Sequence, residues 1–333
     1  MEQAAASEFR VCILFLLLSF GWTWLIGWIA VRFQNDEVFH KNIWVFLGIA
    51  AFGPTLAAFA TYYVFSGRSG VLKLLGRCNP RGLSTPWVLY SCFSMPILLA
   101  TTCGIYVWFG GDAPHTTPWS FFISLLLSIP VGSLGEEFGW RGVLYPHVLN
   151  LLDSYSRALP SHLTHWGLGA SSLPLPTDDA DYLESLKGPA SDRGGVAAVP
   201  SVQPWRGAPL LACVVVGVLW ALWHLPSFYI SALSQNHCNL GQFIIQEILY
   251  SCFYATAAHF SNHSIFLAIL MHASINSFGG LIPWGTHPSP PFTAMPNSIQ
   301  TLVMLGAVAA LVMVLGVDLG REVGSKCTAT RVA

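Results

Sequence analysis

The sequence predicts an all-α integral membrane protein, built as a bundle of about eight transmembrane helices. Three observations favour this fold class. Of the 333 residues, 53% are hydrophobic and only 9% are charged, whereas soluble domains carry about 25% charged residues. The mean hydropathy is +0.56. Apolar segments near the ~20 residues that a bilayer crossing needs recur along the whole chain.

The apolar segments give the expected helices in chain order. We expect them at about 11–32, 43–65, 87–109, 118–137, 209–230, 240–259, 264–283 and 298–319. The first is too long for a signal-peptide core and lacks a small-residue cleavage site, so it is expected to stay as a helix. The fourth is expected to continue as a helix past Arg141.

The distribution of positive charge predicts the orientation in the membrane. If both termini are cytoplasmic, all 15 Lys and Arg residues except Arg32 and Lys41 fall on the cytoplasmic side. Cytoplasmic connections carry the excess of Lys and Arg in multi-pass proteins, so we expect this orientation. The membrane would be the endoplasmic reticulum in a eukaryote and the plasma membrane in a bacterium. The net charge of −1 gives no reason to expect nucleic acid as a partner.

One segment divides the chain into two helical parts. Residues 1–150 are expected to hold the first four helices, and residues 208–333 the last four. Between them, residues 151–207 are rich in Pro, Gly, Ser and Ala and carry an acidic cluster. Such a stretch buries too little apolar surface to offset its ordering entropy. We therefore expect a cytoplasmic, largely disordered insertion.

Two adjacent carboxylates stand at the end of the fourth apolar segment, within the stretch GSLGEEFGWRG at 132–142. Each charge near a bilayer centre costs ~2.5–3.5 kcal/mol even on the mildest scale. Glu137 stands four residues before Arg141, which is the favourable order for a helical ion pair. Glu136 lies on the flank of a face formed by the four glycines, where another helix can approach closely. We therefore expect Arg141 to neutralise Glu137, and Glu136 to point into the protein.

Further polar residues lie inside two later apolar segments. Trp220 and His224 are four residues apart in the fifth segment, and His272 and Asn276 are four apart in the seventh, so each pair shares a helix face. Any one of these residues could be a core residue satisfied by a neighbour. Intramembrane ionisable groups usually face the bundle interior and pair with one another. Together with Glu136, they therefore indicate a shared site.

Two chemistries suit this set of residues. In the first, Glu136 acts as a general base on a water that His224 helps to orient, while His272 and Asn276 donate hydrogen bonds to the oxyanion of a tetrahedral intermediate. In the second, His224, His272 and Glu136 bind a divalent metal such as zinc, which activates the water. The chain has no HExxH motif, so the sequence gives no strong signal for the metal alternative, and zinc stays a possible cofactor.

The expected spans leave one geometric difficulty. At ~1.5 Å per residue, Glu136 lies near the cytoplasmic end of its segment, and His224 lies past the middle of the fifth. The two can meet only if the fifth helix begins outside the bilayer, or if the fourth enters it late.

Three stretches in this order carry a family resemblance: EEFGWRGVLYP, WALWHLPSF and LMHASIN. They resemble the motifs of the CAAX-protease and bacteriocin-processing family, which includes CAAX prenyl protease 2-like enzymes. Those motifs are a Glu-Glu pair with an Arg four residues after the second Glu, an aromatic residue four before a His, and a His four before an Asn.

The resemblance implies an eight-helix intramembrane endopeptidase. It assigns the site to Glu136, His224, His272 and Asn276. The supporting residues would be Glu137 and Arg141, with Trp220 as the aromatic residue of the second motif. The expected partners are the lipid bilayer and a lipidated or membrane-bound protein substrate, cleaved near its C-terminus.

A different class of function remains open at this point. A proton-coupled transporter, or a non-hydrolytic scaffold or immunity protein, could retain the same polar cluster. A transporter favours an internal repeat and helices broken at the midplane. No repeat is visible in the sequence.

Overall fold

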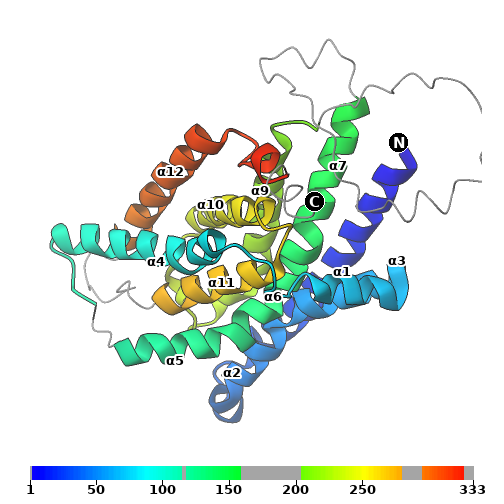
Figure 1. Ribbon diagram of the computed structural model, residues 1–333. Coiled ribbons are helices and arrows are strands. Elements are labelled where there is room, and N and C mark those ends of the chain that lie inside the picture. Colours follow the sequence, from blue (N-terminus) through cyan, green and yellow to red (C-terminus); the bar gives the residue numbers. More distant parts are fainter. Residues whose placement is uncertain (1, 115–117, 159–203, 280–294, 326–333) are drawn as a thin grey trace, which may run out of the picture.

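The computed structural model describes residues 2–114, 118–158, 204–279 and 295–325, and every regular element in these ranges is a helix (Figure 1). The expected all-helical fold class is therefore confirmed for the part of the chain that the structure describes. The N-terminal part holds four helices: α1 (Glu2–Phe33), α2 (Glu37–Ala51), α3 (Gly53–Gly76) and α4 (Thr85–Trp108).

A long helical run follows, interrupted by two π-helical turns. It consists of α5 (Pro118–Ser128), η1 (Ile129–Ser133), α6 (Leu134–Gly139), η2 (Trp140–Leu144) and α7 (Tyr145–Ala158). The expected helix past Arg141 is confirmed, and it extends much further than the expected end of the span near residue 137. The short α6, which carries both carboxylates, therefore lies in the middle of a continuous helical run.

The changes between α and π registers leave backbone carbonyl groups for side-chain donors. Arg77, just after α3, donates from Nη1 to the carbonyl of Gly142 (2.7 Å) and from Nη2 to that of Arg141 (3.0 Å). Thr55 of α3 donates from Oγ1 to the carbonyl of Leu134 (2.6 Å). These bonds fix α6 and its flanking turns against α3.

In the described residues from 204 on, four helices and two short 3₁₀ turns build most of the C-terminal part. They are α9 (Ala208–Trp223), η4 (Leu225–Tyr229), η5 (Ser234–His237), α10 (Leu240–His259), α11 (Ile265–Gly279) and α12 (Met295–Leu315). The span expected at 209–230 ends as an α-helix at Trp223. Pro226 has no backbone N–H to continue the helix, and it lies in the 3₁₀ turn that follows.

The expected count of eight spans is not confirmed. Among the described residues, four helical stretches are long and apolar enough to cross a membrane: Gln3–Phe33, Glu37–Gly76, Thr85–Trp108 and Met295–Leu315. Helices α9 and α11 are apolar but shorter. Hydropathy along the sequence shows how long an apolar stretch is. It does not show where a proline ends a helix, or where a helix with a polar face does not span the membrane.

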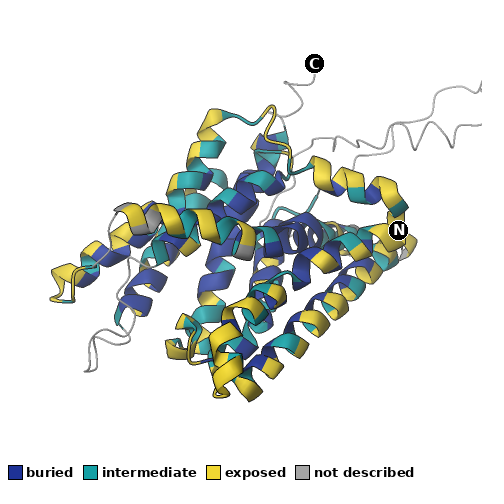
Figure 2. Cartoon of the chain, turned by 90° about the horizontal axis from the view of Figure 1, so that it is seen from below, coloured by how far each residue is buried: buried dark blue, intermediate teal, exposed yellow. Residues whose placement is uncertain are grey.

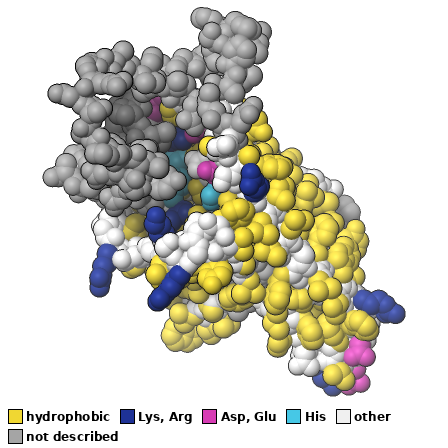
Figure 3. Space-filling view, turned by 90° about the vertical axis from the view of Figure 1, so that its right-hand side faces the viewer, with side chains coloured by type: hydrophobic (Ala, Val, Ile, Leu, Met, Phe, Trp, Pro, Cys, Tyr) yellow, Lys and Arg dark blue, Asp and Glu magenta, His cyan; other side chains and the backbone are white. Residues whose placement is uncertain are grey.

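The exposed and buried faces agree with a protein that lies in a membrane. Buried residues gather in the central helices, and exposed residues mark the outer faces of the peripheral ones (Figure 2). One face of the molecule carries a broad area of hydrophobic side chains, with most of its basic side chains toward the edges (Figure 3). An apolar surface of this kind suits lipid tails, and the basic side chains suit the headgroup region.

Close helix approach at α6 depends on two glycines. A Cβ on Gly135 would lie 2.6 Å from the carbonyl oxygen of Ala51, and one on Gly139 would lie 2.6 Å from Cβ of Pro54. Any side chain at these positions would displace the junction of α2 and α3. Gly132 does not lie on the expected common glycine face, because it belongs to the π-turn η1 and faces Asn276.

The insertion expected at 151–207 begins later than the sequence indicated. Residues 151–158 belong to α7, where Asp153 is buried and pairs with Arg321 (Nη2 to Oδ2, 2.6 Å). Residues 204–207 lead into α9. The remainder, residues 159–203, lies outside the described residues, so its expected disorder stays a prediction.

Candidate active site

Glu136 lies in α6, in the interior of the protein. Its side chain is buried, and Oε2 accepts a hydrogen bond from the indole Nε1 of Trp220 in α9 (2.7 Å). The geometric difficulty raised by the sequence is resolved, because Glu136 is central in the run from 118 to 158 and meets the C-terminal end of α9. The bond to the indole directs the other carboxylate oxygen, Oε1, toward α11.

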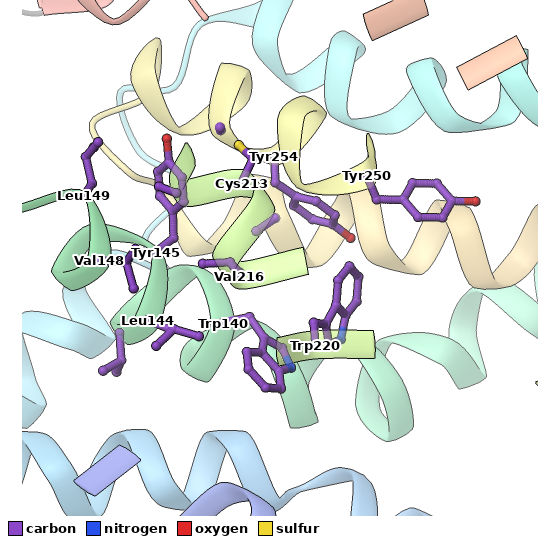
Figure 4. Close-up of a cluster of buried hydrophobic side chains, with 14 of the residues drawn as sticks. Trp140, Leu144, Tyr145, Val148, Leu149, Cys213, Val216, Trp220, Tyr250 and Tyr254 are labelled. Carbon is purple, nitrogen blue, oxygen red and sulfur yellow. The ribbon is translucent and has the colours of Figure 1, made fainter. Parts of the chain in front are cut away.

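Glu137 forms the expected ion pair with Arg141. Arg141 Nη1 lies 3.0 Å from Glu137 Oε1, and both side chains are buried. The guanidinium also lies between two aromatic rings, 3.9 Å from the centroid of Trp220 and 3.6 Å from that of Tyr254. Trp220 and Tyr254 pack edge to face beside Trp140 (Figure 4). The cation is thus held by a carboxylate and by π-faces, both of which favour its charge.

His272 connects the two glutamates. Its Nδ1–H donates to Oε1 of Glu137 (2.7 Å), and its Nε2 lies 4.0 Å from Oε1 of Glu136. Sequence spacing alone did not indicate the bond to Glu137, since it joins α6 to α11. Glu137 therefore has a second role beyond the ion pair: it fixes the tautomer and orientation of the His272 ring.

Asn276 is exposed and lies one turn after His272 on α11. A Cβ on Gly132 would lie 2.7 Å from Asn276 Nδ2 and 4.0 Å from His272 Nε2. The missing side chain of Gly132 leaves room for the carboxamide beside the imidazole. The structure thus brings together the neutral carboxamide of Asn276, the imidazole of His272 and the carboxylate of Glu136.

His224 caps the C-terminus of α9. Its Nδ1–H donates to the backbone carbonyl of Trp220 (2.9 Å). In the neutral ring this tautomer leaves the lone pair on Nε2. The edges of Trp223 and Phe243 confine the imidazole, with ring centroids 4.7 and 5.3 Å away.

A cavity of about 340 Å³ joins these groups. Its lining includes Trp220, His224, His272 and Asn276, but not Glu136 or Glu137, which lie behind them. Cys238 also lines the cavity, and burial raises the pKa of its thiol above the ordinary value. A thiol that stays protonated is a poor nucleophile. The chemistry of this cavity therefore depends on carboxylate, imidazole and carboxamide groups.

Sequence reasoning missed Glu247, which also lines the cavity. It lies on α10, it is 5% exposed, and its Oε2 has no hydrogen-bond partner among the described residues. A signal was present in the sequence, because a charged residue inside the apolar segment 240–259 invites the same question as Glu136.

The residues do not fit the zinc alternative as they are arranged. Ligands about 2.0–2.2 Å from a tetrahedral zinc lie about 3.3–3.5 Å apart, whereas His272 Nε2 and Glu136 Oε1 are 4.0 Å apart. Within the described part of the chain, no group of three or more His, Cys, Asp and Glu side chains is placed to hold a metal ion. We therefore derive no step through a metal.

Comparison with known proteins agrees with this geometry. Residues 118–278 match the family described as Rce1-like, type II CAAX prenyl endopeptidase. The match runs from α5 to α11 and includes all three motifs. A search of curated proteins found no match. The residues that build the site all lie within the matched span, and the match supports the resemblance to the CAAX-protease and bacteriocin-processing family, which implies a peptidase.

Proposed function

We propose that this protein is an intramembrane endopeptidase that hydrolyses a peptide bond near the C-terminus of a lipid-anchored or membrane-bound protein. The observation that carries the proposal is the 4.0 Å separation between Glu136 Oε1 and His272 Nε2, beside a cavity lined by His224 and Asn276. One water at ~2.8 Å can contact both atoms, because their separation is less than twice that distance. A water held there is next to a carboxylate that can take its proton.

Glu136 acts as the general base in this proposal. The indole of Trp220 holds Oε2, so Oε1 is the oxygen that accepts the proton. His224 presents its Nε2 lone pair and orients the water through its second hydrogen. The hydroxide that forms attacks the carbonyl carbon of the scissile bond, and Glu136 returns the proton to the leaving amine.

His272 and Asn276 stabilise the oxyanion. Asn276 donates through Nδ2. Because Nδ1–H of His272 is bound to Glu137, its Nε2 donates only when the ring is an imidazolium. Glu137 then stabilises the cation, as the carboxylate of a catalytic triad does. Two donors fixed before the reaction provide stabilisation that water cannot match.

The family match supports a lipid-modified substrate, in particular a prenylated CAAX-type C-terminus. A cleavage assay tests this. The purified protein in proteoliposomes is given a prenylated C-terminal peptide and its unprenylated counterpart, and the products are identified by mass spectrometry. We expect cleavage of the prenylated peptide that persists in a chelator.

Loss of cleavage in the chelator, with return on adding zinc, would replace the glutamate mechanism by a metal mechanism. No cleavage of any membrane-anchored peptide would favour a non-hydrolytic protein that retains the cluster.

A further inference from the structure

One wall of the cavity is polar, and the mechanism does not use it. Helix α10 contributes three of its side chains and α12 contributes two. We refer to these residues as the polar wall: Gln246, Glu247, Tyr250, Asn297 and Gln300. All five are buried. Their contact with the same cavity as His224, His272 and Asn276 places them where a bound substrate would extend.

The position of the polar wall is fixed by a close helix crossing. A Cβ on Gly217 of α9 would lie 2.4 Å from Cα of Ile248 on α10. Glu247 precedes Ile248, and Trp220 lies one turn after Gly217. The crossing therefore sets Glu247 close to the Trp220 that holds the catalytic carboxylate.

The amide donors of the two glutamines in the polar wall are already engaged within the protein. Gln246 Nε2 donates to the carbonyl of Asn297 (3.2 Å) and to Thr301 Oγ1 (3.0 Å). Gln300 Nε2 donates to the hydroxyl of Tyr250 (2.6 Å). Two acceptors remain, Glu247 Oε2 and Gln300 Oε1, and neither has a hydrogen-bond partner among the described residues.

Such an arrangement is complementary to a donor. Buried polar groups in proteins are nearly always hydrogen-bonded, and leaving one without a partner is costly. Arg141 pairs with Glu137 through Nη1, and no hydrogen bond joins its Nη2 to Glu247. A ligand with a free carboxylate would bring only further acceptors to this wall. A ligand with an ammonium or guanidinium group would satisfy both acceptors.

We propose that the polar wall is a specificity subsite for a Lys or Arg side chain that flanks the scissile bond of the substrate. The apolar stem of that side chain packs on Phe243 and Ile275, which also line the cavity, and its cationic end binds Glu247 and Gln300. The free carboxylate at the C-terminus of the substrate lies away from this wall. The inference rests on the proposed function, and it names the substrate class for the same site.

The test uses membrane-anchored peptides that differ only in the flanking residue, which is Lys, Arg, norleucine or Glu. Norleucine keeps the stem of Lys and removes the charge. The wild type should cleave the Lys peptide with a kcat/KM about 10- to 100-fold above that for norleucine, the range expected for a hydrogen bond to a charged group. In Glu247→Gln the preference should fall below about threefold. Glu37→Gln, a change at an exposed position on α2, should keep it.

A second readout does not need turnover. Peptide binding to Glu136→Gln, which retains the polar wall, should favour Lys over norleucine, and the double variant with Glu247→Gln should lose this preference. Cleavage by the wild type without a Lys or Arg preference would overturn the subsite and leave the hydrolytic assignment standing. Binding that favours Lys over norleucine, without cleavage of any peptide by the wild type, would overturn the hydrolytic assignment and leave the subsite standing. The wild-type comparison does not depend on the folding of any variant.

Discussion

The carboxylate of Glu137 has two roles, and two variants can separate them. Its Oε1 accepts from Arg141 Nη1 at 3.0 Å and from His272 Nδ1 at 2.7 Å. Glu137→Gln keeps the shape and one acceptor oxygen but removes the charge. Arg141→Met removes the ion pair and leaves Glu137 bound to His272. The two variants therefore share one loss and differ in the other.

The structure gives a magnitude for each loss. Removing one partner of a buried ion pair destabilises by ~3–5 kcal/mol, and both variants do this. Only Glu137→Gln removes the charge that stabilises the His272 imidazolium. A hydrogen bond to a charged group contributes ~1.5–3 kcal/mol, which corresponds to about 10- to 100-fold in rate. Glu137→Gln should therefore lower kcat by about 10- to 100-fold more than Arg141→Met does.

The assay measures kcat in proteoliposomes at a temperature where both variants are folded, together with thermal unfolding in detergent. The midpoint of thermal unfolding should fall in both variants, whereas kcat should be lower for Glu137→Gln than for Arg141→Met. Equal kcat values for the two folded variants would refute the reasoning, because Glu137 would then act through stability alone.

Three further predictions follow from the same geometry. Asn276→Ala should lower kcat by ~10²–10³-fold, the usual loss for one oxyanion donor, with KM nearly unchanged; a rise in KM alone would show that Asn276 binds the ground state. Gly132→Ala places a Cβ 2.7 Å from the carboxamide of Asn276 and should lower kcat, whereas Gly104→Ala, with no heavy atom within 4 Å of the new Cβ, should not; equal rates would mean that the carboxamide adjusts without loss. With both termini cytoplasmic, Asn35→Cys should react with an impermeant thiol reagent from outside and Arg81→Cys from inside, in a chain whose native cysteines are replaced; the inverse pattern would reverse the orientation.

Much of the site could be predicted because charge in an apolar segment is conspicuous. The Glu137–Arg141 pair follows from helical spacing alone. The bond from Trp220 to Glu136 and the bond from His272 to Glu137 could not be predicted, because each joins helices far apart in the sequence. Spacing on a helical wheel cannot supply distances between helices.

The fold shows a similar limit. Apolar runs predicted the helical class, but π-turns carry no clear signal in hydropathy, and two of them rotate the residues around α6. This is why Gly132 faces Asn276 instead of the face shared by the other glycines. Glu247 was missed for another reason: its signal was present, but no neighbouring motif drew attention to it.

The central claim is that Glu136 activates the water that cleaves the peptide bond. The most direct measurement compares kcat of the wild type, Glu136→Gln and the exposed control Glu37→Gln on one prenylated peptide in proteoliposomes. The control should keep wild-type activity. Glu136→Gln should lose at least ~10²-fold in kcat, the contribution of a positioned general base, with expression near normal. Equal turnover by the wild type and Glu136→Gln would contradict the role of Glu136 as the base.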